Sequence, residues 1–285
     1  MAFWRKTTLL FCATFAVIIW HAVFEVRGGE LEVYFFDVGQ GDAIFIETPS
    51  GNQVLIDGGP DKSVVSSLSR VMPFYDRSID IVILTHPHSD HFAGLIDVFK
   101  RYEVDLFIEN GFTDSSPVYQ ELEYIMGDAD VKRKIARAGE RILLDQNLWL
   151  DIISPADSPS LVSHENPNEA TVVGRLVYSE TAFLFTGDME KTEEVRLASS
   201  NFELESNILK VAHHGSKNSS TLLFLEKVAP SIAVVSSGKN RYGHPHQEAL
   251  DRLASVGAKI LRTDEQSTIL IKSDGDSFVV SPDIL

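Results

Sequence analysis

Thr85-His86-Pro87-His88-Ser89-Asp90-His91 directly follows the apolar run Ile79-Asp80-Ile81-Val82-Ile83-Leu84. The run predicts a buried strand, which would deliver three imidazoles and a carboxylate at a loop tip. Neutral histidine nitrogen and aspartate oxygen are ligands that divalent metals such as zinc prefer. The first two histidines can point at one cation, and the aspartate and last histidine can face a second one nearby. The stretch therefore predicts a metal site, with a histidine-rich surface loop as the alternative.

Five other segments narrow this interpretation. They are Phe36-Asp37-Val38-Gly39-Gln40-Gly41-Asp42-Ala43, Leu55-Ile56-Asp57-Gly58-Gly59, Thr186-Gly187-Asp188, Lys210-Val211-Ala212-His213-His214-Gly215-Ser216 and Asn240-Arg241-Tyr242-Gly243-His244-Pro245. With them, the chain resembles the metallo-β-lactamase fold hydrolases, whose signature is His-x-His-x-Asp-His. It resembles one branch in particular, the C-terminal hydrolase domain of the ComEC/Rec2 DNA-uptake (competence) proteins and its stand-alone relatives. The resemblance covers about residues 30–277.

This resemblance implies an α/β (α+β) protein with the αββα four-layer sandwich of the metallo-β-lactamase fold. We expect one hydrolase domain over residues 30–285, built from strand-rich halves at 30–142 and 143–285. From the apolar periodicity we expect helices over 62–72, 92–102, 117–126, 131–138, 190–199, 222–228 and 247–256. We expect strands over 31–36, 43–46, 54–56, 79–84, 104–108, two between 141 and 153, 171–178, 181–185, 208–212, 232–236, 259–261, 268–272 and 277–280.

The resemblance also implies two divalent metal ions, Zn²⁺ or Mn²⁺. The residues that match the ligand motifs are His86, His88, Asp90, His91 and Asp188, with His214 and His244 completing the shell or protonating the leaving oxygen. A carboxylate at Asp188 suits a bridging role because its two oxygens can serve two cations. Adjacent side chains at a strand end point in opposite directions, so we favour His214 as the metal-facing residue and leave His213 to pack or to touch substrate. Asp90, His214 and His244 are the candidate catalytic residues.

One expected ligand is missing. Many enzymes of this superfamily have a further histidine between the histidine cluster and the bridging aspartate. The only histidine in that interval is His164, in an unrelated sequence context, and the DNA-uptake branch also lacks this ligand. We therefore expect one metal position to be weakly held or open to a substrate oxygen. Cysteine cannot substitute, because Cys12 is the only one in the chain.

Further residues are candidates to support the metal ligands or to contact substrate. Asp57 is expected to accept a proton from a ligand imidazole. The others are Asp37, Gln40, Asp42, Lys210, His213, Ser216, Lys217 and Asn240. The first three of these also suit a purely turn-stabilising role. Lys210, Ser216 and Lys217 suit phosphate, through charge and hydroxyl or backbone donors.

Charge bears on the substrate class. The formal net charge is −16, which excludes a uniformly basic coat for nucleic acid. Between residues 206 and 247, however, five basic residues (Lys210, Lys217, Lys227, Lys239 and Arg241) stand against Glu226 alone. This segment favours an anionic substrate, and a chance charge fluctuation is the alternative.

The N-terminus predicts export. Arg5 and Lys6 precede an apolar run over 7–24, which predicts a signal peptide or a membrane-spanning helix within residues 1–29. Because no Ala-x-Ala cleavage site follows, we favour an uncleaved anchor with the hydrolase domain outside the cytoplasm. Cleavage, giving a secreted protein, is the alternative. No protein partner is inferable.

Together these features predict a metal-dependent hydrolase that acts by metal-bound hydroxide, without a covalent enzyme intermediate. The favoured substrate is a phosphodiester in nucleic acid, DNA above all, outside the cytoplasm. The alternative is a lactonase or β-lactamase acting on a carbonyl, which would not need the basic segment. A non-enzymatic binding module is the third hypothesis.

Overall fold

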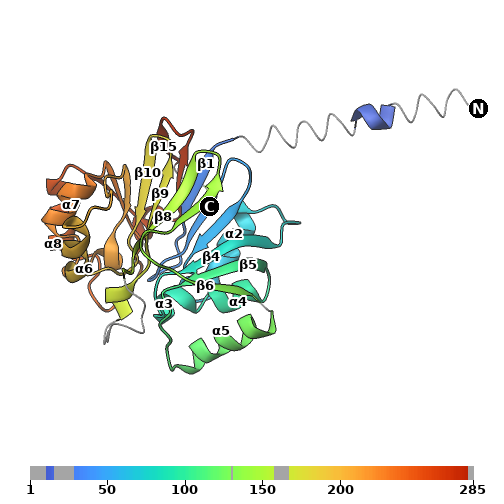
Figure 1. Ribbon diagram of the computed structural model, residues 1–285, viewed down its shortest axis with the longest axis horizontal. Helices are drawn as coiled ribbons and strands as arrows, with labels where there is room; N and C mark the ends of the chain where they lie inside the picture. The colour runs from blue at the N-terminus through green and yellow to red at the C-terminus, as the bar shows by residue number, and fades with distance from the viewer. Residues whose placement is uncertain (1–10, 16–28, 130, 157–166, 282–285) are drawn as a thin grey trace, which may run out of the picture.

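Two β-sheets lie face to face, with helices on both outer sides, in a computed structural model that describes residues 11–15, 29–129, 131–156 and 167–281 (Figure 1). The first sheet has the order β15-β14-β1-β2-β3-β4-β5-β6. Its strands are β1 (Leu31–Phe35), β2 (Ile44–Glu47), β3 (Gln53–Ile56), β4 (Ser78–Leu84), β5 (Glu103–Glu109), β6 (Lys132–Ile135), β14 (Ile269–Ser273) and β15 (Phe278–Ser281). Helices α2 (Ser63–Val71), α3 (Ser89–Phe92), α4 (Leu95–Phe99) and α5 (Pro117–Asp128) accompany this sheet.

The second sheet has the order β13-β12-β11-β10-β9-β8-β7. Its strands are β7 (Arg141–Asp145), β8 (Leu148–Ser154), β9 (Val173–Tyr178), β10 (Thr181–Phe185), β11 (Ile208–Lys210), β12 (Ile232–Val235) and β13 (Lys259–Arg262). Its helices are α6 (Lys191–Ala198), α7 (Leu222–Val228), α8 (Gln247–Ser255) and the short α9 (Thr263–Gln266). Two 3₁₀ turns, η2 (Pro167–Ala170) and η3 (Ala212–Gly215), precede β9 and follow β11.

Alternation along the strands produces three apolar layers. In β2, Ile44 and Ile46 point into the core between the sheets, whereas Phe45 points into the core under α2, α4 and α5. In β10, Phe183 faces the other sheet and Leu184 faces the helices of its own side. Because successive strand side chains point to opposite faces, a strand apolar at every position must be covered on both sides. The predicted αββα sandwich is therefore confirmed.

The boundary between the two halves was predicted wrongly. The last hairpin, β14–β15, does not stay with the second half but returns to the first sheet, where β14 pairs antiparallel with β1. Ile269 and Ile271 enter the core between the sheets, and Leu270 enters the core of the first helix layer. Burial on both faces makes β14 an interior strand, which a division of the chain at residue 143 cannot accommodate.

Two predicted helices also differ. Residues 131–138 contain an edge strand, β6, not a helix, because backbone pairing with β5 outweighs a weak helical pattern. The helix expected over 92–102 begins earlier, at Ser89, and is split into α3 and α4. Gly94 lies at the split, where a Cβ would be 2.0 Å from the carbonyl oxygen of Gly58. This close packing brings the turn after β3 against the start of α4.

The predicted membrane anchor remains untested. Residues 1–10 and 16–28, which carry most of it, lie outside the described residues, as does His164. Among the residues that are described, no helix combines the length and apolar character needed to cross a bilayer.

Candidate metal centre

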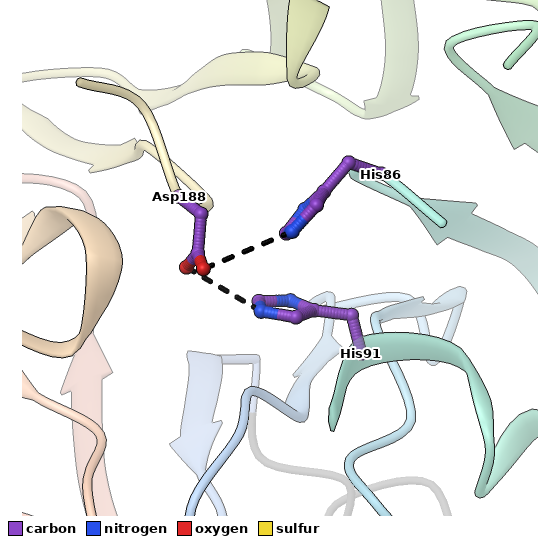
Figure 2. A group of neighbouring side chains, drawn as sticks. All are labelled: His86, His91 and Asp188. Atoms are coloured by element: carbon purple, nitrogen blue, oxygen red, sulfur yellow. Dashed lines mark ion pairs between the residues drawn. The ribbon is translucent and has the colours of Figure 1, made fainter. Parts of the chain in front are cut away.

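The candidate site lies where strands of both sheets end. His86 follows β4, His91 lies on α3, and Asp188 follows β10. Figure 2 shows the Asp188 carboxylate facing both imidazoles, with its Oδ2 3.8 Å from His86 Nε2 and its Oδ1 3.4 Å from His91 Nε2. All three side chains are buried. Residues about a hundred positions apart in the sequence thus meet because the two sheets present their strand ends side by side.

Two further histidines approach the same carboxylate. His213 Nε2 lies 3.6 Å from Asp188 Oδ2, and His214 Nε2 lies 3.5 Å from Asp188 Oδ1. Each oxygen of Asp188 therefore faces its own pair of imidazoles. His88 Nδ1 is 3.0 Å from His86 Nε2, on the Oδ2 side, and Asp90 Oδ2 is 3.5 Å from His214 Nε2, on the Oδ1 side. This is the arrangement in which one carboxylate can bridge two cations.

The prediction that only one of His213 and His214 faces the site is wrong. That prediction assumed a strand through residue 212, but β11 ends at Lys210 and the two histidines lie in η3. Both adopt left-handed backbone angles, with φ of 48° and 53°. The alternation of a strand therefore does not apply, and both side chains turn toward Asp188. His213 lies on the Oδ2 side of Asp188, with His86 and His88. It can therefore take the place of the further histidine that the sequence lacks.

The residues present fit a pair of cations. Within the described residues, His91 Nε2, His214 Nε2 and Asp188 Oδ1 are buried atoms without a hydrogen-bond partner, although they converge on one point. Buried polar atoms are normally satisfied, so such a set indicates a missing ligand. Two of the ligand groups whose atoms lie within 4.8 Å of one another are His86, His91 and Asp188, and Asp90, His91 and His214.

The electrostatics of the protein alone also call for positive charge here. Burial lowers the pKa of His214, but Asp188 and Asp42 outweigh burial and raise it to about 10. Burial raises the pKa of Asp90, but the nearby His214 and His91 outweigh burial and bring it down to about 2. Burial lowers the pKa of His86, which favours the neutral form that binds metals. Protons on His214 and its neighbours therefore balance the negative charge of the carboxylates. A bound cation can supply the same positive charge at this position.

Asp57 lies behind the ligands, as the sequence predicts. Its Oδ2 is 2.8 Å from His91 Nδ1, so the other ring nitrogen, Nε2, is aimed at Asp188. The backbone N–H and hydroxyl of Thr85 both donate to Asp57, at 2.8 Å each. These bonds fix both the carboxylate and the imidazole that it orients.

Lys210 does not contact the space in front of the metal ligands, which corrects the prediction that it binds phosphate. Its side chain is fully buried, and its Nζ lies 2.7 Å from Asp42 Oδ2. The other oxygen, Asp42 Oδ1, lies 3.5 Å from His214 Nδ1. Asp42 therefore lies beside the ring nitrogen of His214 that faces away from Asp188, and Lys210 pairs with Asp42 there.

Four other predicted residues support loops. Asp37 accepts a hydrogen bond from the N–H of Gly39, in its own turn. The buried Ser216 accepts one from the N–H of Asn218. Lys217 is exposed, and its carbonyl accepts from Arg252. The side chain of Asn240 bonds only within its own loop among the described contacts.

A cavity of about 520 Å³ opens onto the centre. The predicted residues that line it are Gln40, His88, Asp90, Asp188, His213, His214 and His244. The sequence reasoning missed Asp114, Ser116, Asn168 and Tyr242, which also line it. Only Tyr242 carried a signal, because it lies in a quoted motif. Glu190 was missed as well; its Oε1 is 3.2 Å from His213 Nδ1, and its signal was its position two residues after Asp188.

Comparison with known proteins matches this geometry. Residues 36–239 match the family model described as the Metallo-beta-lactamase superfamily. The chain belongs to this superfamily. It is 30% identical over 277 residues to "ComE operon protein 3" of Bacillus subtilis (strain 168), and the matched region covers 90% of this chain and 35% of that protein. It is also 30% identical over 246 residues to "Competence protein ComA" of Neisseria gonorrhoeae, covering 84% of this chain and 32% of that protein.

The resemblance to the competence-protein branch is therefore confirmed, and this member of the metallo-beta-lactamase superfamily spans about a third of the length of these relatives. Among solved structures, the metallo-beta-lactamase fold protein YhfI from Bacillus subtilis superposes with a TM-score of 0.58 at 11% identity. The match covers 85% of this chain and all of that one. At this identity the likeness supports the fold alone.

Proposed function

We propose that this metallo-hydrolase is a phosphodiesterase that cuts nucleic acid, DNA above all. The observation that carries the proposal is that the two oxygens of Asp188 face different pairs of imidazoles at the floor of an open cavity. Two cations side by side suit an in-line displacement at phosphorus, in which both the attacking and the leaving oxygen need stabilisation.

The residues divide into two ligand sets. His86, His88, His213 and Oδ2 of Asp188 would hold one cation, and Asp90, His91, His214 and Oδ1 of Asp188 would hold the other. When bound, two Zn²⁺ or Mn²⁺ ions lower the pKa of a water molecule and neutralise charge on the phosphate. Asp57 hydrogen-bonds the second ring nitrogen of His91, and Glu190 lies 3.2 Å from the second ring nitrogen of His213, close enough to orient that ring by charge.

His244 is placed to serve the leaving oxygen. It lines the cavity, and its ring centre is 5.3 Å from that of His213 and 6.4 Å from that of His214. Burial and the nearby His213 lower its pKa to about 4, so the ring is neutral at neutral pH. A neutral imidazole can donate one hydrogen bond to the leaving oxygen without adding charge to the site.

Two facts favour a phosphodiester over a carbonyl substrate. Lys239 and Arg241 are exposed on the loop that carries His244, where positive charge attracts an anion. The relatives named above include one named for competence, a process of DNA uptake. An uncharged lactone would gain nothing from the basic loop.

The test uses the full chain with Zn²⁺ or Mn²⁺ on single-stranded DNA, bis-p-nitrophenyl phosphate and a chromogenic β-lactam. We expect hydrolysis of both phosphodiesters, abolished in Asp188→Asn and retained in Asp105→Asn, which neutralises an exposed aspartate of β5. Turnover of the lactam alone would overturn the proposal. Metal binding without turnover of any substrate would favour a binding module.

We further propose that the enzyme acts outside the cytoplasm, held to the membrane by residues 1–29. The support is the basic flank and apolar run of the sequence. Protease added to intact cells should degrade the hydrolase domain, and the protein should sediment with membranes. Protection from protease, or recovery in the medium, would contradict the anchored arrangement.

A further inference from the structure

Tyr242 lies at the mouth of the cavity, on the loop that carries His244. Its side chain is 56% exposed, yet it lines the same cavity as the metal ligands. Its ring stacks on that of His244, with centres 5.7 Å apart and planes inclined by 30°. The guanidinium of Arg241 lies over the Tyr242 ring, 5.4 Å from its centre. A half-exposed aromatic ring, flanked by a guanidinium and an imidazole, therefore stands at the entrance, and both planar groups of the Tyr242–Arg241 pair can stack on a base.

The loop that carries Tyr242 is held in shape by Asn240. The Asn240 Oδ1 accepts from the N–H groups of Tyr242 and His244, at 3.0 and 3.1 Å. Its Nδ2 donates to the carbonyls of Gly238 and His244, at 2.9 and 2.7 Å. A Cβ on Gly238 would lie 2.4 Å from the carbonyl carbon of Gly39, so the base of the loop is packed directly on the turn before β2. The aromatic surface is thus preorganised, which lowers the entropic cost of binding.

A line of rings connects this surface with the centre. From Tyr242 the contacts run to His244 and then to His213, whose ring centre is 5.3 Å from that of His244. His213 Nε2 is in turn 3.6 Å from Asp188. In a nucleotide, the base is one sugar ring away from its phosphate. A phosphodiester at the centre would therefore bring a neighbouring base to Tyr242.

We propose that Tyr242, together with Arg241, forms a stacking subsite for an unpaired nucleobase next to the phosphodiester that is cut. The proposal rests on the phosphodiesterase function and adds selectivity for single-stranded nucleic acid. In a duplex the faces of each base are covered by its neighbours, so a protein ring reaches them only in an unpaired strand. Because every base has such a face, the subsite accepts different sequences.

The experiment compares two strands of equal length and charge: oligothymidylate and a strand of abasic tetrahydrofuran residues. With the full chain and Mn²⁺, we expect wild type to prefer oligothymidylate about 10-fold in kcat/KM, in the lower part of the range for one stacked base. Tyr242→Ala should raise KM for oligothymidylate about 10-fold with little change in kcat, and should leave the abasic strand unaffected. Tyr242→Phe should keep the preference, because it keeps the ring.

Tyr75→Ala is the matched control, since Tyr75 is 63% exposed and precedes β4, at the opposite end of the strand from His86. It should behave as wild type. Fluorescence anisotropy of the labelled strands without divalent metal gives a second readout and should show the same order of affinities. Equal use of both strands by wild type, or an equal loss on both strands in Tyr242→Ala, would overturn the stacking subsite alone. Cleavage of neither strand by wild type would defeat the phosphodiesterase function, and the subsite with it.

Discussion

The ammonium of Lys210 lies 2.7 Å from the carboxylate of Asp42, and both side chains are almost completely excluded from solvent beside His214. Lys210 Nζ also donates to the carbonyl of Val211 at 3.0 Å. The pair links the turn after β1 in the first sheet to the end of β11 in the second. A buried charge costs several kcal/mol unless its partner is present, so neither residue is replaceable alone.

Replacing Lys210 alone should therefore destabilise the fold. Lys210→Met leaves the Asp42 carboxylate buried without its partner, and we expect the free energy of unfolding to fall by about 3–5 kcal/mol. Adding Asp42→Leu should recover part of this loss. Urea denaturation provides the measurement, with Lys227→Met, at an exposed lysine of α7, as the control. Equal midpoints for Lys210→Met and wild type would refute the role of the pair.

Asp57→Ala should weaken metal binding without removing a ligand. The change frees the His91 imidazole to rotate, because the 2.8 Å contact to its Nδ1 is lost. Loss of such a supporting carboxylate typically lowers metal affinity about 10- to 100-fold. Titration against a chromophoric chelator measures this affinity. The control is Asp105→Ala, and an affinity equal to wild type in Asp57→Ala would show that His91 needs no orienting partner.

Glu190→Ala should affect His213 specifically. Glu190 Oε1 lies 3.2 Å from His213 Nδ1, the only carboxylate among the described residues for which an ion pair with this nitrogen is found. We expect kcat/KM on bis-p-nitrophenyl phosphate to fall about 10- to 100-fold, since an unoriented imidazole faces Asp188 only part of the time. Glu180→Ala, at an exposed glutamate, should have no effect. An equal loss of activity in both variants would indicate a general charge effect.

Glu194 predicts a pH dependence of stability. This buried carboxylate accepts the N–H groups of Ser220 and Thr221, just before α7. Burial raises its pKa, and the hydrogen bond from the Thr221 N–H offsets the rise only in part. The folded state therefore binds a proton more tightly than the unfolded state.

The contribution of Glu194 to stability consequently falls as the pH rises from the ordinary glutamate pKa through the raised one. Glu194→Gln has no such titration, so the difference in unfolding free energy between wild type and variant should change in that window and be constant above it. Urea denaturation at a series of pH values tests this, with Glu180→Gln as control. A difference independent of pH would show that the pKa is not raised.

Much of the site was predictable because it depends on local order. An apolar run ending at Leu84 and followed by His-x-His-x-Asp-His places metal ligands at a strand end, whatever the rest of the chain does. The alternation in β2 and β10 similarly predicts layers. The late hairpin was not predictable, because whether β14 pairs with β1 or with the second sheet depends on which core receives Ile269 and Ile271.

The sequence by itself determined the superfamily, the sandwich and the set of residues able to bind metal, because these follow from residue types at fixed spacings. Only the tertiary structure decided that His213 and His214 both face Asp188, that Lys210 is buried against Asp42, and that Tyr242 stands at the cavity mouth. Each of these depends on contacts between the two sheets or on left-handed backbone angles after a strand. Spacing along a chain does not encode either one.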